Sequence, residues 1–538
     1  MSPNQPERMS SQLERILIIL CLPFALTFLP DTSLQGTALP GTGLPGTSLP
    51  GTGLPGTSLS GTSLSGTSLP GFIGSDAAPD NTVQVQANAA MVENDANRLQ
   101  PFSARVQTGS TVVGADLARD QNDRVPVQRE YTREIEVLAD QPEVREAFRF
   151  IQSFNSQTVQ NQIELNEIPA PPFGEEQRAA RYVELLEEYG LTDVEIDPEG
   201  NVIGRRPGTR PARTTTSANG AVVLSAHLDT VFPEETDVSV EIRNDTLYAP
   251  GISDDARGLT AVLTVLRALE ESSVETERDI WFVGTVGEEG LGDLRGVKSL
   301  FDRHADDISA FISIDGSHPG RITHRALGSH RYRVTFEGPG GHSWSAFGTA
   351  NTAHALGRAI YHFDREASQF VLDGPRTSYN VGRIGGGTSV NAVPYSNWME
   401  VDMRSVDQQA LLGIDSLLKE AVRQGLDEVN DLRRAGETLT LDMEMIGNRP
   451  SGEIPADDPF VQRAMAATQW FGDEPQLHIA STDSNVPISL DIPAFTIGGG
   501  GRGGGMHSLD EWWTDDGSGV RGVQRALLIL LAQAGLVD

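Results

Sequence analysis

The sequence predicts an α/β protein: a mixed-sheet, three-layer α/β/α domain, the sheet domain, interrupted by a ferredoxin-like α+β domain. Short apolar runs at residues 221–225, 280–283 and 310–314 are typical of buried strands, and an amphipathic helical segment follows the first of them. Between residues 325 and 446 the pattern changes to strand, helix, strand, strand, helix, strand, which is the ferredoxin-like order. The smaller domain is therefore an insertion in the larger one.

Two helices of the sheet domain are indicated by apolar residues at helical spacing. In the first, apolar positions between residues 179 and 186 share one face, and the helix is expected to end near Gly190. The second begins near Leu259, shortly after two adjacent aspartates. A proline-rich turn at residues 168–174 precedes the first helix, and a last strand is expected at residues 494–497.

The inserted domain is predicted from four strand-like and two helical segments. The strands are expected at residues 332–336, 377–384, 398–404 and 438–445, and the helices at residues 351–363 and 408–423. A loop with the sequence Gly-Pro-Gly-Gly-His-Ser follows the first strand and ends at residue 343.

The first 125 residues are predicted to carry no chemistry. Residues 1–30 join a basic start to an apolar run that fits a signal peptide, and this run is too short and too interrupted by proline to be a stable transmembrane anchor. Residues 31–125 read as a low-complexity linker, with a five-residue glycine-containing repeat over residues 36–70. These features favour export, periplasmic or extracellular, over a cytoplasmic protein that starts later, for example at Met9.

Length, charge and cysteine content exclude several classes of partner. A chain of 538 residues is expected to form more than one domain. Its formal net charge of −33 argues against nucleic-acid phosphate as a partner. The single cysteine, Cys21, lies in the amino-terminal segment, so the chain can form no internal disulfide.

Ionisable residues follow each predicted strand of the sheet domain. Glu288 and Glu289 come shortly after the run at residues 280–283, and adjacent carboxylates at the end of a buried strand need a positive partner such as a metal ion. His227 and Asp229 follow the first run, and Asp315 follows the third. Because loops at the carboxyl ends of strands converge at one edge of an open sheet, these residues are expected to meet.

Two further segments are aimed at that edge. Asp254 or Asp255 lies at the start of the second helix, and His507 follows a glycine-rich loop at residues 498–505 that allows close backbone approach. Imidazole and carboxylate ligands without a thiolate suit Zn²⁺, Mn²⁺ or Co²⁺. Five ligand positions are too many for one tetrahedral ion but enough for two ions that share a carboxylate. A non-catalytic, Ca²⁺-binding surface module is the rival of another class, and the two histidines disfavour it.

The order of these motifs resembles the co-catalytic di-zinc metallopeptidases that include peptidase T, glutamate carboxypeptidase and succinyl-diaminopimelate desuccinylase. The motifs are His-x-Asp, Asp-Asp, Glu-Glu, Asp-Gly and a late histidine, and the resemblance extends over residues 137–538. A related aminopeptidase family has a similar arrangement of metal ligands but lacks a lid domain. The insertion from about residue 325 to 446 argues against membership of that family.

The resemblance implies a role for each residue of the site. His227 and Asp315 would bind one metal ion and Glu289 and His507 the other, with Asp254 bridging them. The ions would be two divalent ions, Zn²⁺ first, with Co²⁺ or Mn²⁺ as alternatives. Asp229 would bind no metal but would form a hydrogen bond with His227 and raise the basicity of that ring. Glu288, which is next to a ligand, would be the general base.

The inserted domain resembles the lid and dimerisation domain of that family, which implies a homodimer formed through residues 325–446. His342 would reach the active site of the partner subunit and stabilise the oxyanion. Asn391 would contact the substrate, and Arg449 would bind its terminal carboxylate. Thr482 or Asp483 would contact the metal ligands without binding metal itself.

The expected function is hydrolysis of amide bonds in short peptides by a di-, tri- or exopeptidase. The alternative substrate is an N-acyl amino acid, which the same chemistry would cleave. Residues 126–324 and 447–538 would form the two parts of the catalytic domain.

Overall fold

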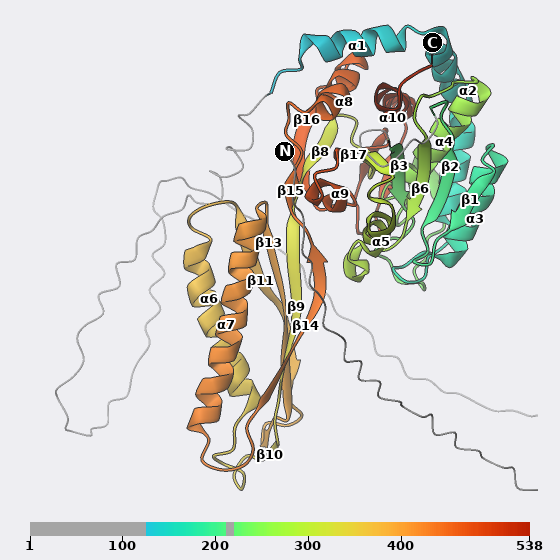
Figure 1. The fold of residues 1–538 in the computed structure, drawn as a ribbon. Helices are drawn as coiled ribbons and strands as arrows, with labels where there is room; N and C mark the ends of the chain where they lie inside the picture. The colour runs from blue at the N-terminus through green and yellow to red at the C-terminus, as the bar shows by residue number, and fades with distance from the viewer. Residues whose placement is uncertain (1–124, 211–219, 538) are drawn as a thin grey trace, which may run out of the picture. The chain divides into compact units, whose positions relative to one another are not determined.

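The computed structural model of the protein describes residues 125–210 and 220–537 (Figure 1). The signal-like segment predicted for residues 1–30 and the linker predicted for residues 31–125 lie outside these ranges, apart from residue 125 itself. Within the described ranges, no helix is both long enough and apolar enough to cross a membrane.

A nine-stranded mixed sheet forms the centre of the sheet domain. Its strands are β1 (Asp193–Ile196), β2 (Val202–Arg206), β3 (Ala221–His227), β6 (Ile280–Thr285), β7 (Ile308–Ile314), β8 (Arg321–Ala326), β15 (Gly452–Glu453), β16 (Gln476–Ala480) and β17 (Ala494–Ile497). The strand order is β1-β2-β6-β3-β7-β17-β8-β15, and β16 pairs with β8. The three predicted apolar runs are thus the neighbouring parallel strands β6, β3 and β7.

Helices cover both faces of this sheet and confirm the predicted three-layer arrangement. They are α1 (Arg129–Ala139), α2 (Pro142–Asn166), α3 (Glu176–Glu188), α4 (Ala256–Glu271), α5 (Arg295–His304), α8 (Pro459–Trp470), α9 (Asn485–Ser489) and α10 (Ser518–Ala534). Successive residues of a strand point to opposite faces. On β6, Gly284 accordingly packs against Tyr182 of α3, whereas the ring of Trp281 meets His304 of α5 on the other face.

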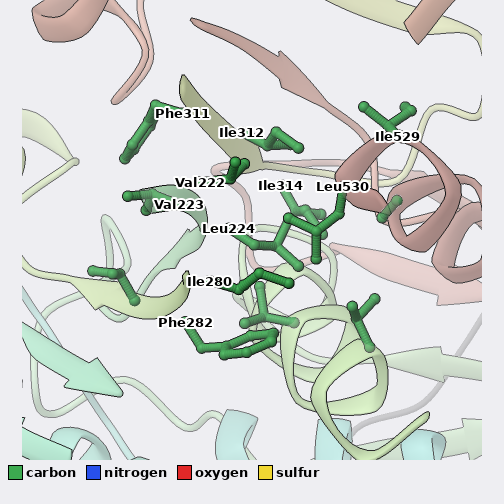
Figure 2. Packing of buried hydrophobic residues seen from close by; sticks show 14 of the residues in the cluster. Val222, Val223, Leu224, Ile280, Phe282, Phe311, Ile312, Ile314, Ile529 and Leu530 are labelled. Carbon is green, nitrogen blue, oxygen red and sulfur yellow. The ribbon is translucent and has the colours of Figure 1, made fainter. Parts of the chain in front are cut away.

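The buried core follows the same alternation along the strands. In Figure 2, Leu224 and Ile312 lie on the side of the sheet that carries Leu530 of α10, and Phe311 points away from it. The ring of Phe311 packs edge-on against Phe301 of α5, with centroids 5.5 Å apart. Burying each such side chain contributes about 1.5–3 kcal/mol to stability, so the strands form a firm base for the loops at their ends.

A second, four-stranded sheet joins the end of the chain to its middle. Its strands are β4 (Glu241–Arg243), β5 (Thr246–Tyr248), β18 (Arg502–Gly504) and β19 (Trp512–Thr514), in the order β18-β19-β5-β4. Next to this ladder, the backbone N–H of Ala249 donates to the carbonyl of Glu511 over 3.1 Å. The pairing holds the loop that carries His507 beside the segment that leads to Asp254.

The inserted domain has the predicted ferredoxin-like topology. Its elements are β9 (Gly328–Glu337), α6 (Thr352–Phe370), β11 (Thr377–Gly386), β13 (Ser396–Ser405), α7 (Gln408–Leu432) and β14 (Thr440–Arg449). The strands form an antiparallel sheet in the order β11-β13-β9-β14, and α6 and α7 lie side by side against one face of it (Figure 1). A short ladder between β10 (Gly341–His342) and β12 (Ala392–Val393) ties two of its loops together.

Both helices of this domain end later than the sequence predicted. α6 continues past residue 363 to Phe370 because Ala367 is still buried on the face that meets the sheet. α7 continues past residue 423 to Leu432 for the same reason, with Val429 buried near its end. The helical spacing of apolar residues therefore continues beyond the predicted ends, where the sequence has no clear helix-stop signal.

The crossing of α6 and α7 provides a test of this packing. A Cβ atom on Gly425 of α7 would lie 2.7 Å from the backbone nitrogen of Ala359 and 2.8 Å from the carbonyl oxygen of Ala355. Gly425→Ala should therefore push the helices apart and cost about 1–3 kcal/mol. Gly357→Ala on α6 is the matched control, since its Cβ would meet nothing within 4 Å and should stabilise by about 0.5–1 kcal/mol.

Thermal unfolding of the two variants checks this expectation. The melting temperature should fall for Gly425→Ala and rise slightly for Gly357→Ala. Equal shifts in both variants would contradict the close backbone contact between the helices.

Candidate metal centre

The predicted convergence of strand ends at one edge of the sheet is present in the structure. His227 is the last residue of β3, the glutamate pair follows β6, and Asp315 follows β7. The carboxylate of Asp229 accepts hydrogen bonds from the backbone N–H groups of Glu288 and Glu289 at 2.9 and 2.8 Å. This bridge joins the loops that leave β3 and β6.

Asp254 lies between the two histidines predicted to bind metal. Its Oδ1 is 3.0 Å from Nε2 of His227, and its Oδ2 is 3.2 Å from Nε2 of His507. Nε2 of His507 also lies 2.9 Å from Oε1 of Glu289. Ligand atoms of His227, Asp254 and Glu289 fall within 4.8 Å of one another, which is close enough to hold an ion. A carboxylate with one oxygen facing each histidine has the arrangement expected of a bridge between two ions.

His507 reaches this position from a loop in an unusual conformation. Its φ of 63° is in the left-handed region, which residues other than glycine seldom adopt. Such conformations cluster at functional sites. More than half of its side chain is exposed, so His507 closes the centre from the solvent side.

Asp255 has a different task from Asp254, although the peptide bond between them is cis and both are buried. One of its oxygens accepts from the N–H of Gly258 at 3.0 Å, which caps α4, and the other accepts from the N–H of His227 at 3.2 Å. Since Asp255 is used in this way, Asp254 is the aspartate left to face the histidines.

The hydrogen bond that His227 was expected to donate to the Asp229 carboxylate goes to a different acceptor in the structure. Nδ1 of His227 lies 2.9 Å from the backbone oxygen of Asp229 but 3.8 Å from its Oδ1. A carbonyl can only accept, so Nδ1 carries a proton, and Nε2 is the ring nitrogen that a metal could take after losing its own proton. The carboxylate instead accepts hydrogen bonds from the two amides of the glutamate loop.

The charge balance of the site fits divalent cations. Burial raises the pKa of Asp255 and Glu288 well above the usual range. Burial, helped by the neighbouring Asp254 carboxylate, raises the pKa of Asp315 to about 6. Burial also raises the pKa of Asp483 to about 6. Carboxylates held together at such cost need a compensating charge, and metal ions are often the largest local charges in a site.

Arg449, which was expected to bind the substrate, is buried beside Glu288 and is not open to solvent. Its guanidinium is buried, and Nη1 lies 3.2 Å from Oε1 of Glu288 and 3.2 Å from Oγ of Ser481. Nη2 donates to the backbone carbonyl of Glu288. The guanidinium therefore grips the predicted general base.

His342 and Asn391 lie together in the inserted domain. Both are exposed, and the N–H of Ser343 donates to the carbonyl of Asn391 over 2.9 Å. Among the contacts of the described residues, neither side chain touches a predicted metal ligand. His342 comes after the end of β9, whose ten residues span roughly 30 Å from the point where the strand leaves the sheet domain.

Glu511 was missed by the sequence analysis. It is fully buried, and its carboxylate accepts from the N–H groups of Gly251, Ser253 and Asp254 at 2.9, 2.8 and 3.0 Å. The sequence did contain a signal for a buried role of this residue: Glu511 stands directly before two tryptophans and four positions after His507. Asp483, one of the two residues expected to support the site, accepts a hydrogen bond from the hydroxyl of Thr285, the last residue of β6.

Metal binding should release protons. The contacts with Asp254 and Glu289 raise the pKa of His507 to about 10. Burial alone would lower the pKa of His227, but Asp254 and the nearby carboxylates outweigh it and raise that pKa well above its usual value. These shifts favour the protonated form of both rings in the metal-free protein, and a histidine that binds metal must be neutral.

Apparent metal affinity should therefore rise between pH 6 and pH 8, by about tenfold per pH unit for each proton released. Calorimetric titrations in buffers of different ionisation enthalpy measure the protons directly. An affinity that does not change with pH would contradict the protonated histidines.

Comparison with known proteins places this centre in a family. Residues 223–531, more than half of the chain, match the model of peptidase family M20/M25/M40. A Pyrococcus abyssi protein, named as a LysW-lysine/LysW-ornithine hydrolase, is 37% identical over 138 residues, which are 26% of this chain and 34% of that one. The chain thus matches only about a third of this relative.

Solved structures show the same fold. A tripeptidase from Staphylococcus aureus superposes with a TM-score of 0.57 at 22% identity, over 70% of this chain and 98% of that one. The dinuclear metal-binding peptidase YxeP from Bacillus subtilis gives 0.51 at 16% identity, over 71% and 98%. With the family match over the strand ends and the late histidine, the chain belongs to peptidase family M20/M25/M40.

Proposed function

We propose that the protein hydrolyses amide bonds of short peptides at a dinuclear metal centre, with Glu288 as the general base. The observation that carries the proposal is the position of Asp254, which has one carboxylate oxygen against each of His227 and His507. The tripeptidase with the same fold supports short peptides as the substrate class.

The residues of the sheet edge would divide between two ions. His227 and Asp315 would hold one ion, Glu289 and His507 the other, and Asp254 would bridge them. Imidazole and carboxylate donors suit Zn²⁺ best among the candidates, with Co²⁺ or Mn²⁺ as alternatives. When bound, such ions supply an acidified water and a polarised amide carbonyl.

Glu288 is suited to moving the proton in this reaction. Its Oε1 is held 3.2 Å from Arg449, which fixes the direction of the carboxylate and leaves the other oxygen to accept. Glu288 would take the proton of the attacking water and give it to the leaving amine. Burial raises the pKa of Glu288, which favours a carboxyl group that can hold the proton between the two steps.

Substrate contacts are proposed for Arg449 and Asn391. Arg449 would bind the terminal carboxylate of the peptide through its Nε–H group, which has no hydrogen-bond partner among the described residues, while Nη1 and Nη2 keep their contacts with Glu288. Asn391 and His342 are exposed on the inserted domain, so they would act on a second subunit in a homodimer formed through that domain. There His342 would donate to the oxyanion of the partner's substrate.

Glu288→Ala tests the general base. The variant should keep its fold and its metal content, because no ligand is removed, and lose roughly 10²–10⁴-fold in kcat. Glu187→Ala, which removes an exposed glutamate on α3, is the matched control and should keep full activity. Peptide turnover and metal analysis on the same samples measure both effects, and full turnover by Glu288→Ala would rule out this role.

Subunit mixing tests the role of His342 in the partner's site. His342→Ala should lose roughly 10²–10³-fold in kcat, as expected when one oxyanion donor is removed. Mixed with Glu288→Ala, it should regain activity well above either parent, because each hybrid dimer rebuilds one complete site. Absence of recovery after demonstrated subunit exchange would contradict a role in the partner's site.

A further inference from the structure

Glu511 is a buried carboxylate whose partners are backbone amides. Oε1 accepts from Ser253 and Asp254, and Oε2 accepts from Gly251. Within the described residues, no cationic side chain forms an ion pair with it. Burying a carboxylate is costly unless its oxygens are hydrogen-bonded, and these three amides offset part of that cost.

The three amides belong to the turn that presents Asp254. Successive N–H groups that converge on one point form a concave site for an anion, and here the anion is a side chain from more than 250 positions later in the chain. The turn itself ends in the cap of α4, where Asp255 holds Gly258. Glu511 thus fixes the turn on one side of Asp254, and the helix fixes it on the other.

The segment that carries Glu511 also carries His507, so one stretch of chain positions both His507 and the Asp254 that faces it. The backbone of Glu511 is bound to Ala249, and β19 continues the pairing with β5. Gly503 packs so closely that a Cβ there would lie 2.3 Å from Oγ of Ser253. Backbone pairing and close packing between their two loops therefore set the distance between His507 and Asp254.

We propose that Glu511 is a positioning residue of the metal centre, which holds the Asp254 turn at the distance from His507 that the second ion requires. The inference rests on the proposed function because Asp254 is assigned there as the bridging ligand. It adds that the spacing of the bridge depends on a side chain that binds no metal.

Glu511→Gln tests this role with little change in volume. The amide replaces one acceptor oxygen by an N–H₂ group, which faces a backbone donor and cannot accept from it. Asp510→Asn is the matched control, because it removes the same charge from the neighbouring, exposed position. The measurements are stepwise Co²⁺ affinity of the metal-free protein, the visible spectrum of the Co²⁺ form, and thermal unfolding without metal.

The expected result is a loss of at least about tenfold in affinity for one of two ions in Glu511→Gln, with a changed Co²⁺ spectrum. Asp510→Asn should match the wild-type protein. Wild-type affinities and spectrum in Glu511→Gln, or equal losses in both variants, would overturn the proposal.

Glu511→Asp keeps the test decisive if Glu511→Gln does not fold. It retains the charge but withdraws the oxygens by one methylene, so it should lose affinity for one ion to a smaller extent. Wild-type affinity in Glu511→Asp would then overturn the proposal. A wild-type protein that binds no metal would contradict the proposed function itself, whereas two ions in both proteins at equal affinity would contradict only the role of Glu511.

Discussion

The structure depends on a concentration of carboxylates at one edge of a buried sheet. Asp229, Asp254, Asp255, Glu288 and Glu289 are all withdrawn from water within a few residues of the strand ends. Like charges in such surroundings repel each other and resist desolvation. The fold can keep them there only by supplying hydrogen-bond donors from the backbone and room for cations.

The carboxylates divide into two groups according to how that demand is met. Asp229, Asp255 and Glu511 accept hydrogen bonds from backbone amides, and each of them ties together loops that carry the proposed metal ligands. Asp254 and Glu289 face histidine nitrogens and are available to metal. The first group fixes the geometry in which the second can bind, which explains why so many acidic residues gather at one place.

Much of this arrangement could be predicted from sequence because it depends on local pattern. Apolar runs predicted β3, β6 and β7, and the position of His227, Glu289 and Asp315 at the carboxyl ends of these runs predicted that they meet at one edge of the sheet. Contacts between distant segments left no comparable pattern. The pairing of Arg449 with Glu288 and the amide cluster on Glu511 arise only when β14 and β19 are brought to the sheet edge, and the helix ends depended on burial.

The decisive measurement is the metal content per chain of the purified protein, taken together with hydrolysis of a panel of dipeptides, tripeptides and N-acetyl amino acids. Our expectation is about two transition-metal ions per chain, and hydrolysis of short peptides that a chelator abolishes. A protein without transition metal, or one whose hydrolysis persists after complete removal of metal, would contradict it.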